Sequence, residues 1–268
     1  MPRASVGRTV PILMYHRIAV TTSSAMRRFS VTPTAFDAQL RYLKTNGFAG
    51  LTVSDFVNFS QHRRDMLPEK PIVLTFDDAF TDFYTEAAPL LRAYGFPATL
   101  YVVAGQLNGT SSWLPGEDAR LPLLDGSQLI ELRQLGVEIG AHSMTHRALD
   151  WLDAIALKNE IEESKGRLEQ CLDAPVESFA YPFGFSSDRV RKQVKAAGYS
   201  SACAVRYETS STIDNPFDLA RHIVPGGVSI SDFGNIADGH PPLPALLWDR
   251  VRSRAGSLAR RTVARSIV

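Results

Sequence analysis

Cysteines, excess charge and long apolar runs are all scarce in this sequence of 268 residues. Its two cysteines, Cys171 and Cys203, are too few for a disulfide framework or a thiolate metal site, and we expect both to be reduced. The net charge of +1 gives no basic excess that would attract nucleic acid, which argues against nucleic-acid binding. No apolar run reaches the length of a transmembrane helix.

We also expect no secretory signal, because few residues separate Met1 from the first apolar run at 10–15. We therefore expect a cytoplasmic protein. The length and a hydrophobic fraction of 44% suit one barrel-sized domain and leave little for a second. We expect this domain at residues 1–243 and a basic amphipathic tail at 244–268.

The predicted tail interleaves apolar residues with arginines. The apolar residues are Leu246, Leu247, Val251, Leu258, Val263 and Ile267, and the arginines are Arg250, Arg252, Arg254, Arg260, Arg261 and Arg265. A basic amphipathic helix can lie on an anionic membrane surface, here the inner face, which would suit a lipid-linked glycan substrate. A helix packed on the domain with its arginines in water, or a frayed terminus, would give the same pattern.

Short apolar runs alternate with stretches of helical periodicity along the chain. The runs lie at 10–15, 71–75, 98–104, 137–140 and 178–181, and the helical stretches at 33–46, 82–94, 153–171 and 187–197. This alternation predicts βα units and a parallel sheet. In the last but one helical stretch, Glu160 and the other charged residues are predicted to form a solvated outer face.

Two motifs carry side chains that can bind a metal ion. Residues 75–80 (TFDDAF) place two adjacent carboxylates where an apolar strand runs out into a turn, and residues 140–146 (GAHSMTH) offer two imidazoles after a second apolar run. Alone, the acidic pair is typical of a turn or helix cap, and the histidine pair of a polar loop. Together they would project from one end of a parallel sheet, which favours a divalent-metal site with open positions for water and substrate.

With the later segment 179–184 (FAYPFG), these motifs resemble the first three motifs of the polysaccharide deacetylase family, the NodB-like carbohydrate esterases. The resemblance covers residues 8–225 and keeps the family's order. It implies a single α/β domain, folded as a distorted, incomplete (β/α) barrel. It also implies hydrolysis of N-acyl groups on amino sugars with one divalent metal ion, usually zinc and in some members cobalt, nickel or manganese.

The resemblance also implies roles for individual residues. The metal ligands would be Asp78, His142 and His146. Asp77 would be the general base, because a carboxylate held just off the metal keeps the basicity that a bound one loses. The turn at 181–183 would supply a backbone N–H for the oxyanion, with Phe183 as donor.

A leaving amine also needs a general acid. The family usually supplies it from a C-terminal Leu-x-His strand, and no good copy follows residue 185. The apolar strand at 11–15 instead ends in His16, which is similar to the branch typified by exopolysaccharide poly-N-acetylglucosamine deacetylases, with this strand at the N-terminus. His16 is therefore the preferred acid. His222 is the rival, but it misses Leu-x-His by one position, and that register change would turn it to the opposite face of a strand.

Two departures from the family pattern concern the surroundings of the base. Many members carry an arginine in the third motif that orients the base, where this chain has Ala180. Arg221, on a late strand, is the candidate to pair with Asp77 from across the barrel, and an ordinary surface arginine is its alternative. The tryptophan-bearing fourth motif is not identifiable, and Trp113 would either line a sugar subsite or simply anchor its loop.

The sequence thus predicts a metal-dependent hydrolase that removes an N-acetyl, or else N-formyl, group from an amino sugar in a glycan or glycoconjugate precursor. The substrate would be an N-acetylated amino sugar, an oligosaccharide or a lipid-linked glycan. One alternative is a C–N hydrolase of a non-sugar amide or cyclic imide, which a compact pocket without an open groove would favour. The other is an inactive glycan-binding or assembly protein, for which Ala180 is the only hint.

Overall fold

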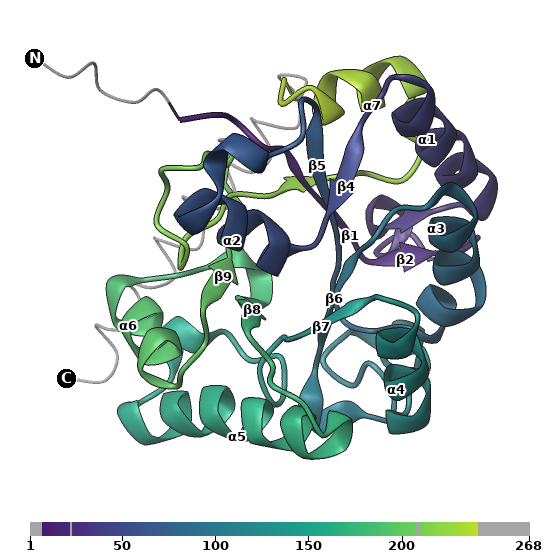
Figure 1. Ribbon diagram of the computed structural model, residues 1–268. Coiled ribbons are helices and arrows are strands. Elements are labelled where there is room, and N and C mark those ends of the chain that lie inside the picture. Colours follow the sequence, from purple (N-terminus) through teal and green to yellow (C-terminus); the bar gives the residue numbers. More distant parts are fainter. Residues whose placement is uncertain (1–6, 22, 207–208, 241–268) are drawn as a thin grey trace, which may run out of the picture.

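The computed structural model describes residues 7–21, 23–206 and 209–240. An eight-stranded parallel sheet forms the centre of this part, and helices surround it (Figure 1). Among the described residues, no helix is both long and apolar enough to cross a membrane. The tail predicted at 244–268 lies outside the described residues, so its helix and its membrane contact stay predictions.

The sheet curves into an incomplete barrel, as predicted. Its strands follow the order β10 (His222–Ile223), β1 (Ile12–Tyr15), β5 (Pro71–Phe76), β6 (Thr99–Val102), β7 (Glu138–Ala141), β8 (Ser178–Ala180) and β9 (Ser201–Cys203). Strand β4 (Ala49–Leu51) pairs with the first half of β5, whose second half pairs with β6. A parallel bridge between Cys203 and Leu219 links β9 to the segment before β10. The strands β2 (Arg17–Ile18) and β3 (Ser30–Val31) form a separate pair.

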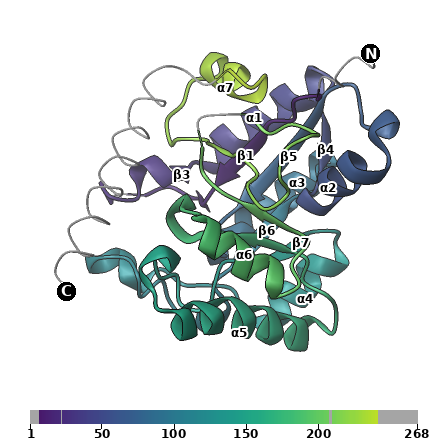
Figure 2. The ribbon, with the colours of Figure 1, turned by 90° about the vertical axis from the view of Figure 1, so that its left-hand side faces the viewer.

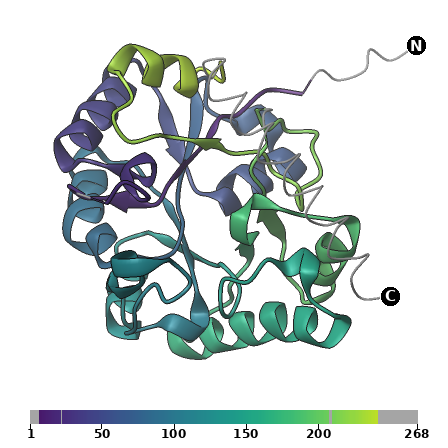
Figure 3. The ribbon, with the colours of Figure 1, turned by 180° about the vertical axis from the view of Figure 1, so that it is seen from behind.

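Most helices lie around the outside of the sheet (Figures 2 and 3). They are α1 (Pro33–Thr45), α2 (Val53–His62), α3 (Ala88–Tyr94), α4 (Gly126–Gln134), α5 (Ala154–Leu172), α6 (Asp188–Ala196) and α7 (Ile230–Ala237). Each except α3 follows a Ser, Thr or Asp whose side chain accepts a hydrogen bond from a first-turn N–H. The helix predicted at 82–94 instead starts with a π-helical turn, Phe83–Ala87, because Pro89 has no N–H to continue an α-helical pattern.

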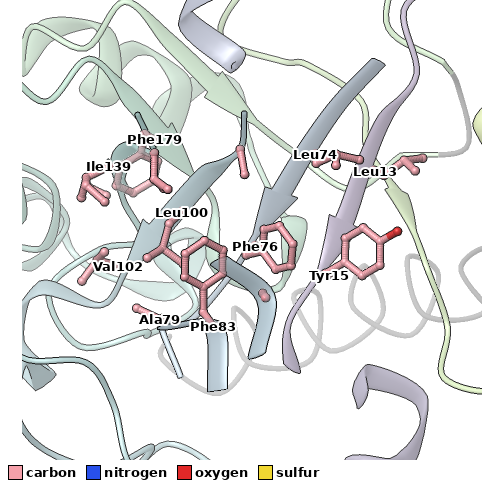
Figure 4. Packing of buried hydrophobic residues seen from close by; sticks show 14 of the residues in the cluster. Leu13, Tyr15, Leu74, Phe76, Ala79, Phe83, Leu100, Val102, Ile139 and Phe179 are labelled. Atoms are coloured by element: carbon pink, nitrogen blue, oxygen red, sulfur yellow. The ribbon is translucent and has the colours of Figure 1, made fainter. Parts of the chain in front are cut away.

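Side chains alternate between two faces of the sheet, and both faces are buried. Ile12 points into the barrel and packs with Val73 and Tyr101. The next residue, Leu13, packs with Leu74 in the cluster between the sheet and the helices (Figure 4). Strands buried on both faces explain why β5 and its neighbours are apolar without a gap.

One end of the barrel is closed by α2. Its residues Val53 and Phe56 belong to the interior cluster, and the Val53 N–H donates to Thr99 Oγ1 at the start of β6 (3.0 Å). The period of two then carries the interior face from Ile12 to His16, and from Val73 to Asp77. Polar side chains therefore collect at the carboxyl end of the strands, opposite α2.

Two glycines test this packing with opposite signs. Gly140→Ala on β7 should lower the free energy of unfolding by about 1–3 kcal/mol, because the new methyl would lie 2.5 Å from the buried ring of Tyr101. Gly166→Ala, in the middle of α5 with nothing within 4 Å of the new methyl, should raise it by about 0.5–1 kcal/mol. Urea unfolding of both variants measures the two changes, and equal signs would contradict this view of the barrel.

Candidate metal centre and active site

The two predicted motifs meet at the carboxyl end of the sheet. Asp77 and Asp78 follow β5 directly, and the loop with His142 and His146 follows β7. Asp78 adopts a left-handed backbone with φ 77°, so the chain turns sharply as it leaves the strand. The strand between them in the sheet is β6, and the curvature of the barrel brings the two loops together.

Asp78, His142 and His146 form one compact cluster, as the sequence predicts. Asp78 Oδ1 lies 3.4 Å from His146 Nε2 and 3.7 Å from His142 Nε2. All three side chains are buried, and one ligand atom from each lies within 4.8 Å of the others. The structure thus brings the proposed ligands together from two separate loops.

The donor atoms of this cluster fit a divalent cation. His142 Nδ1 lies 2.7 Å from the carbonyl oxygen of Ala180, so it carries the proton and Nε2 presents a lone pair to Asp78. Asp78 Oδ1 is buried without a hydrogen-bond partner. Burial raises the pKa of Asp78, as does the charge of Asp77, and burial lowers the pKa of His142 and, further, of His146. A cation would relieve these costs, since it favours a carboxylate and neutral imidazoles.

Asp77 is held by a buried, two-pronged ion pair with Arg221. The guanidinium donates from Nη1 to Oδ1 (2.6 Å) and from Nη2 to Oδ2 (2.8 Å). Burial alone would raise the pKa of Asp77, but the charge and hydrogen bonds of Arg221, together with the nearby imidazoles of His142 and His16, outweigh it and lower the pKa to about 2. The carboxylate therefore stays ionised at neutral pH.

The predicted pairing of Arg221 with Asp77 is thus present, and the surface-arginine alternative is wrong, because Arg221 is fully buried. Its Nη1 also donates to Thr75 Oγ1 (3.2 Å), and the guanidinium lies 5.4 Å from the centre of the Tyr101 ring. Ala180 is buried in the interior cluster, on the β8 side. An arginine just before β10 therefore holds Asp77 in place of a side chain at residue 180.

His16 and His222 lie on different sides of the barrel wall. His16 lines the same cavity as Asp77 and packs on Phe29, with ring centroids 4.8 Å apart. His222 pairs in register with Leu13, whose side chain faces the helices, and its Nε2 lies 2.9 Å from Thr209 Oγ1. His222 does not line the cavity, as its register in the sequence suggests.

A cavity of about 300 Å³ lies over the cluster. Apolar and aromatic side chains make most of its wall, among them Met26, Trp113 and Phe183. The Trp113 ring stacks on His146 at 4.9 Å, and Phe183 meets the same imidazole edge-on at 4.8 Å. Trp113 therefore both lines the cavity and packs against a proposed ligand. Phe183 itself has a left-handed backbone, φ 61°, in the turn Pro182–Gly184.

Residues 64–202, about half of the chain, match the family model described as polysaccharide deacetylase. The chain belongs to the polysaccharide deacetylase family. The family suggested by the three motifs is therefore confirmed, together with the incomplete barrel. The matched residues include β5, β7 and β8, the strands in which the three motifs begin.

Several known proteins match most of this chain. The Bacillus subtilis protein YxkH is 28% identical over 226 residues, which cover 84% of this chain and 75% of the relative. The poly-β-1,6-N-acetyl-D-glucosamine N-deacetylase of Staphylococcus epidermidis is 25% identical over 69% of this chain and 68% of the relative. The Streptococcus pyogenes deacetylase PplD, solved with acetate, is 25% identical with a TM-score of 0.75, covering 88% of this chain and all of PplD.

Glu160 corrects the prediction for the helix at 153–171. It was expected to face solvent, but only 6% of it is exposed, and its carboxylate accepts hydrogen bonds from Met144 N–H (3.0 Å) and Thr145 N–H (2.8 Å). The helical spacing carries a signal for this, because Glu160 lies on the buried stripe between Leu157 and Ser164. It is thus a polar residue that the deacetylase motifs do not contain, yet it contacts the loop between the two histidines.

The Arg221–Asp77 pair should contribute strongly to the free energy of unfolding. Arg221→Gln should lower the free energy of unfolding by about 3–5 kcal/mol at neutral pH, because a buried carboxylate loses its counter-charge. The loss should shrink as the pH falls toward 2, where Asp77 becomes protonated even beside Arg221. Urea unfolding at several pH values measures both effects.

A double-mutant cycle of Arg221 with Asp77 and one control variant complete the unfolding experiment. In an Asp77→Asn background the Arg221→Gln loss should be much smaller, and an equal loss in both backgrounds would contradict the pairing. Arg206→Gln breaks a partly exposed ion pair with Asp218, and it should cost less than about 1 kcal/mol.

Proposed function

We propose that this protein is a metal-dependent hydrolase that removes the N-acetyl group from an amino sugar in a glycan or glycoconjugate precursor. The observation that carries the proposal is the ionised, arginine-held Asp77 beside a buried Asp78–His142–His146 cluster under one cavity. The family match and the relatives named as N-deacetylases support the same chemistry.

Asp78, His142 and His146 would hold the cation, for which we propose zinc, with cobalt, nickel or manganese as alternatives. Such a cation acidifies a water molecule and polarises the acyl oxygen, which suits a base as weak as Asp77. Asp77 would take the proton from the attacking water, and Arg221 keeps its carboxylate charged before that step and oriented throughout.

The leaving amine would be protonated by His16, which reaches the cavity from the end of β1. The oxygen of water adds to the acyl carbon, the C–N bond breaks, and the products are acetate and a free amine. The backbone N–H of Phe183, in the turn after β8, is the proposed donor to the oxyanion. His16 would thus supply the general acid, and Phe183 would supply the stabilisation of the oxyanion, that amide hydrolysis requires.

The size and lining of the cavity suit the binding of one N-acylated sugar unit. A volume of about 300 Å³ is small, and the aromatic faces of Trp113 and Phe183 suit the apolar faces of a pyranose ring. An oligosaccharide or a lipid-linked glycan would present such a unit while the rest of it stays outside. A compact cavity also suits a non-sugar amide, but the N-deacetylase relatives favour the amino sugar.

Three further points concern an inactive glycan-binding protein, an N-formyl substrate and the cellular location of the protein. The inactive-binder alternative rests on Ala180, and it is weakened because Arg221 holds Asp77 instead. An N-formyl substrate would need the same groups as an N-acetyl one. A cytoplasmic location, with contact at the inner face of the membrane through residues 244–268, stays a prediction that cell fractionation tests.

Acetate release from a panel of N-acetylated amino-sugar oligomers, including β-1,6-linked N-acetylglucosamine, tests the function. Zinc- or cobalt-loaded protein should release acetate, and Asp77→Asn should lower kcat by about 10²–10⁴-fold while it still binds metal, because the base is lost but the three metal ligands are kept. Asp65→Asn, at an exposed residue outside the cavity, is the control. Metal-loaded protein that releases no acetate from any oligomer would argue for a non-sugar amide.

The pH profile separates the two candidate acids. His16→Gln should lower kcat by about 10²–10⁴-fold and remove the alkaline limb of kcat/KM, because that limb reports loss of the proton from the general acid. His222→Gln should leave the alkaline limb of kcat/KM in place, since the His222 ring is hydrogen-bonded to Thr209 and does not line the cavity. The reverse pattern would move the acid role to His222.

A further inference from the structure

The loop between the two histidines, residues 143–145, is fixed from the side of α5 by Glu160. Oε2 of this carboxylate accepts from the N–H groups of Met144 and Thr145, at 3.0 and 2.8 Å, and Oε1 accepts from the Thr145 hydroxyl. The side chain is 6% exposed, so these bonds are shielded from water. They are charge-assisted and therefore stronger than bonds to a neutral acceptor.

The opposite side of the loop is held by the chain that follows β6. Ala104 N–H donates to the Ser143 carbonyl (3.0 Å), and Gly105 N–H donates to the Met144 carbonyl (2.9 Å). Gly105 permits this approach because it has no side chain: a Cβ there would lie 2.4 Å from the Met144 oxygen. The loop is thus clamped between Glu160 and Gly105.

The clamp matters because the loop has an unfavourable backbone conformation. Ser143 (φ 63°) and His146 (φ 60°) are both left-handed, which costs a non-glycine residue about 1–3 kcal/mol each. Two successive N–H groups after a left-handed residue form a concavity that binds anions, and here Glu160 occupies it. The Ser143 hydroxyl adds one bond by accepting from His146 N–H (3.0 Å).

We propose that Glu160 is a positioning residue for the metal site. The hydrogen bonds that it accepts come from Met144 and Thr145, so it holds the peptide groups that join His142 to His146 and sets the spacing of their imidazoles. The inference rests on the proposed function, because it assumes that these histidines bind a cation. Supporting groups of this kind typically change metal affinity by about 10–100-fold when they are lost.

Metal binding by the full-length protein tests the proposal without any substrate. Glu160→Gln keeps the shape but removes the charge and replaces one acceptor oxygen with an NH₂ donor, which cannot accept from the loop. We expect the Kd for Co²⁺ to rise about 10–100-fold, with a changed Co²⁺ absorption spectrum. Glu163→Gln, at an exposed residue of the same helix, is the matched control and should leave both unchanged.

Gly105→Ala provides a second variant that involves no charge. Its methyl group would push the loop from the other side, so it should weaken Co²⁺ binding and alter the spectrum in the same way. Circular dichroism shows whether each variant is folded. If Glu160→Gln does not fold, Gly105→Ala decides by the same two measurements.

The outcomes separate this proposal from the proposed function. Folded Glu160→Gln protein with wild-type Co²⁺ affinity and spectrum overturns the positioning role and leaves the metal site intact. Wild-type protein that binds no Co²⁺ and no Zn²⁺ overturns the metal-dependent function, and the positioning role with it. Weakened binding in Glu160→Gln and Gly105→Ala but not in Glu163→Gln supports the proposal.

Discussion

Two adjacent aspartates lie buried at the end of β5, and two such charges cannot share a dry site without compensation. The surrounding residues compensate each of them differently. Arg221 neutralises Asp77 through two short hydrogen bonds, which keeps that carboxylate ionised. The groups beside Asp78 Oδ1 are the imidazoles of His146 and His142, at 3.4 and 3.7 Å, so its charge calls for a cation. The division of labour between base and ligand follows from this difference in partners.

The barrel is what makes these unequal partners available. Asp77 and Arg221 are 144 positions apart in the chain, yet they meet because β10 pairs with β1 and β1 with β5. The histidine loop arrives from β7 and is held there by α5 and by the chain after β6. The site therefore depends on at least four elements, and each of them is fixed by a core packed on both faces of the sheet; Figure 4 shows the face toward the helices.

Much of this was accessible from local sequence. The apolar runs at 71–75 and 137–140 correspond to β5 and β7, and the polar residues that follow each run lie at the metal centre. Both cysteines are free, as their number suggested. The short strands β4 and β9 were not predicted, since a strand of three residues has too little pattern to recognise, and neither were the helices α2, α4 and α7.

The residues that carry the chemistry can be found in the sequence alone: the acidic pair, the histidine pair, their positions at strand ends and hence the family. Which of these groups pair with each other depends on the fold. Whether His16 or His222 faces the cavity depends on the register of a strand, because one residue turns a side chain to the other face. Glu160 looked solvated because its charge suggested water, but its partners lie in a loop that only the packing of α5 on the sheet brings within reach. Local patterns record residue type and periodicity, whereas burial and pairing depend on partners far away in the chain.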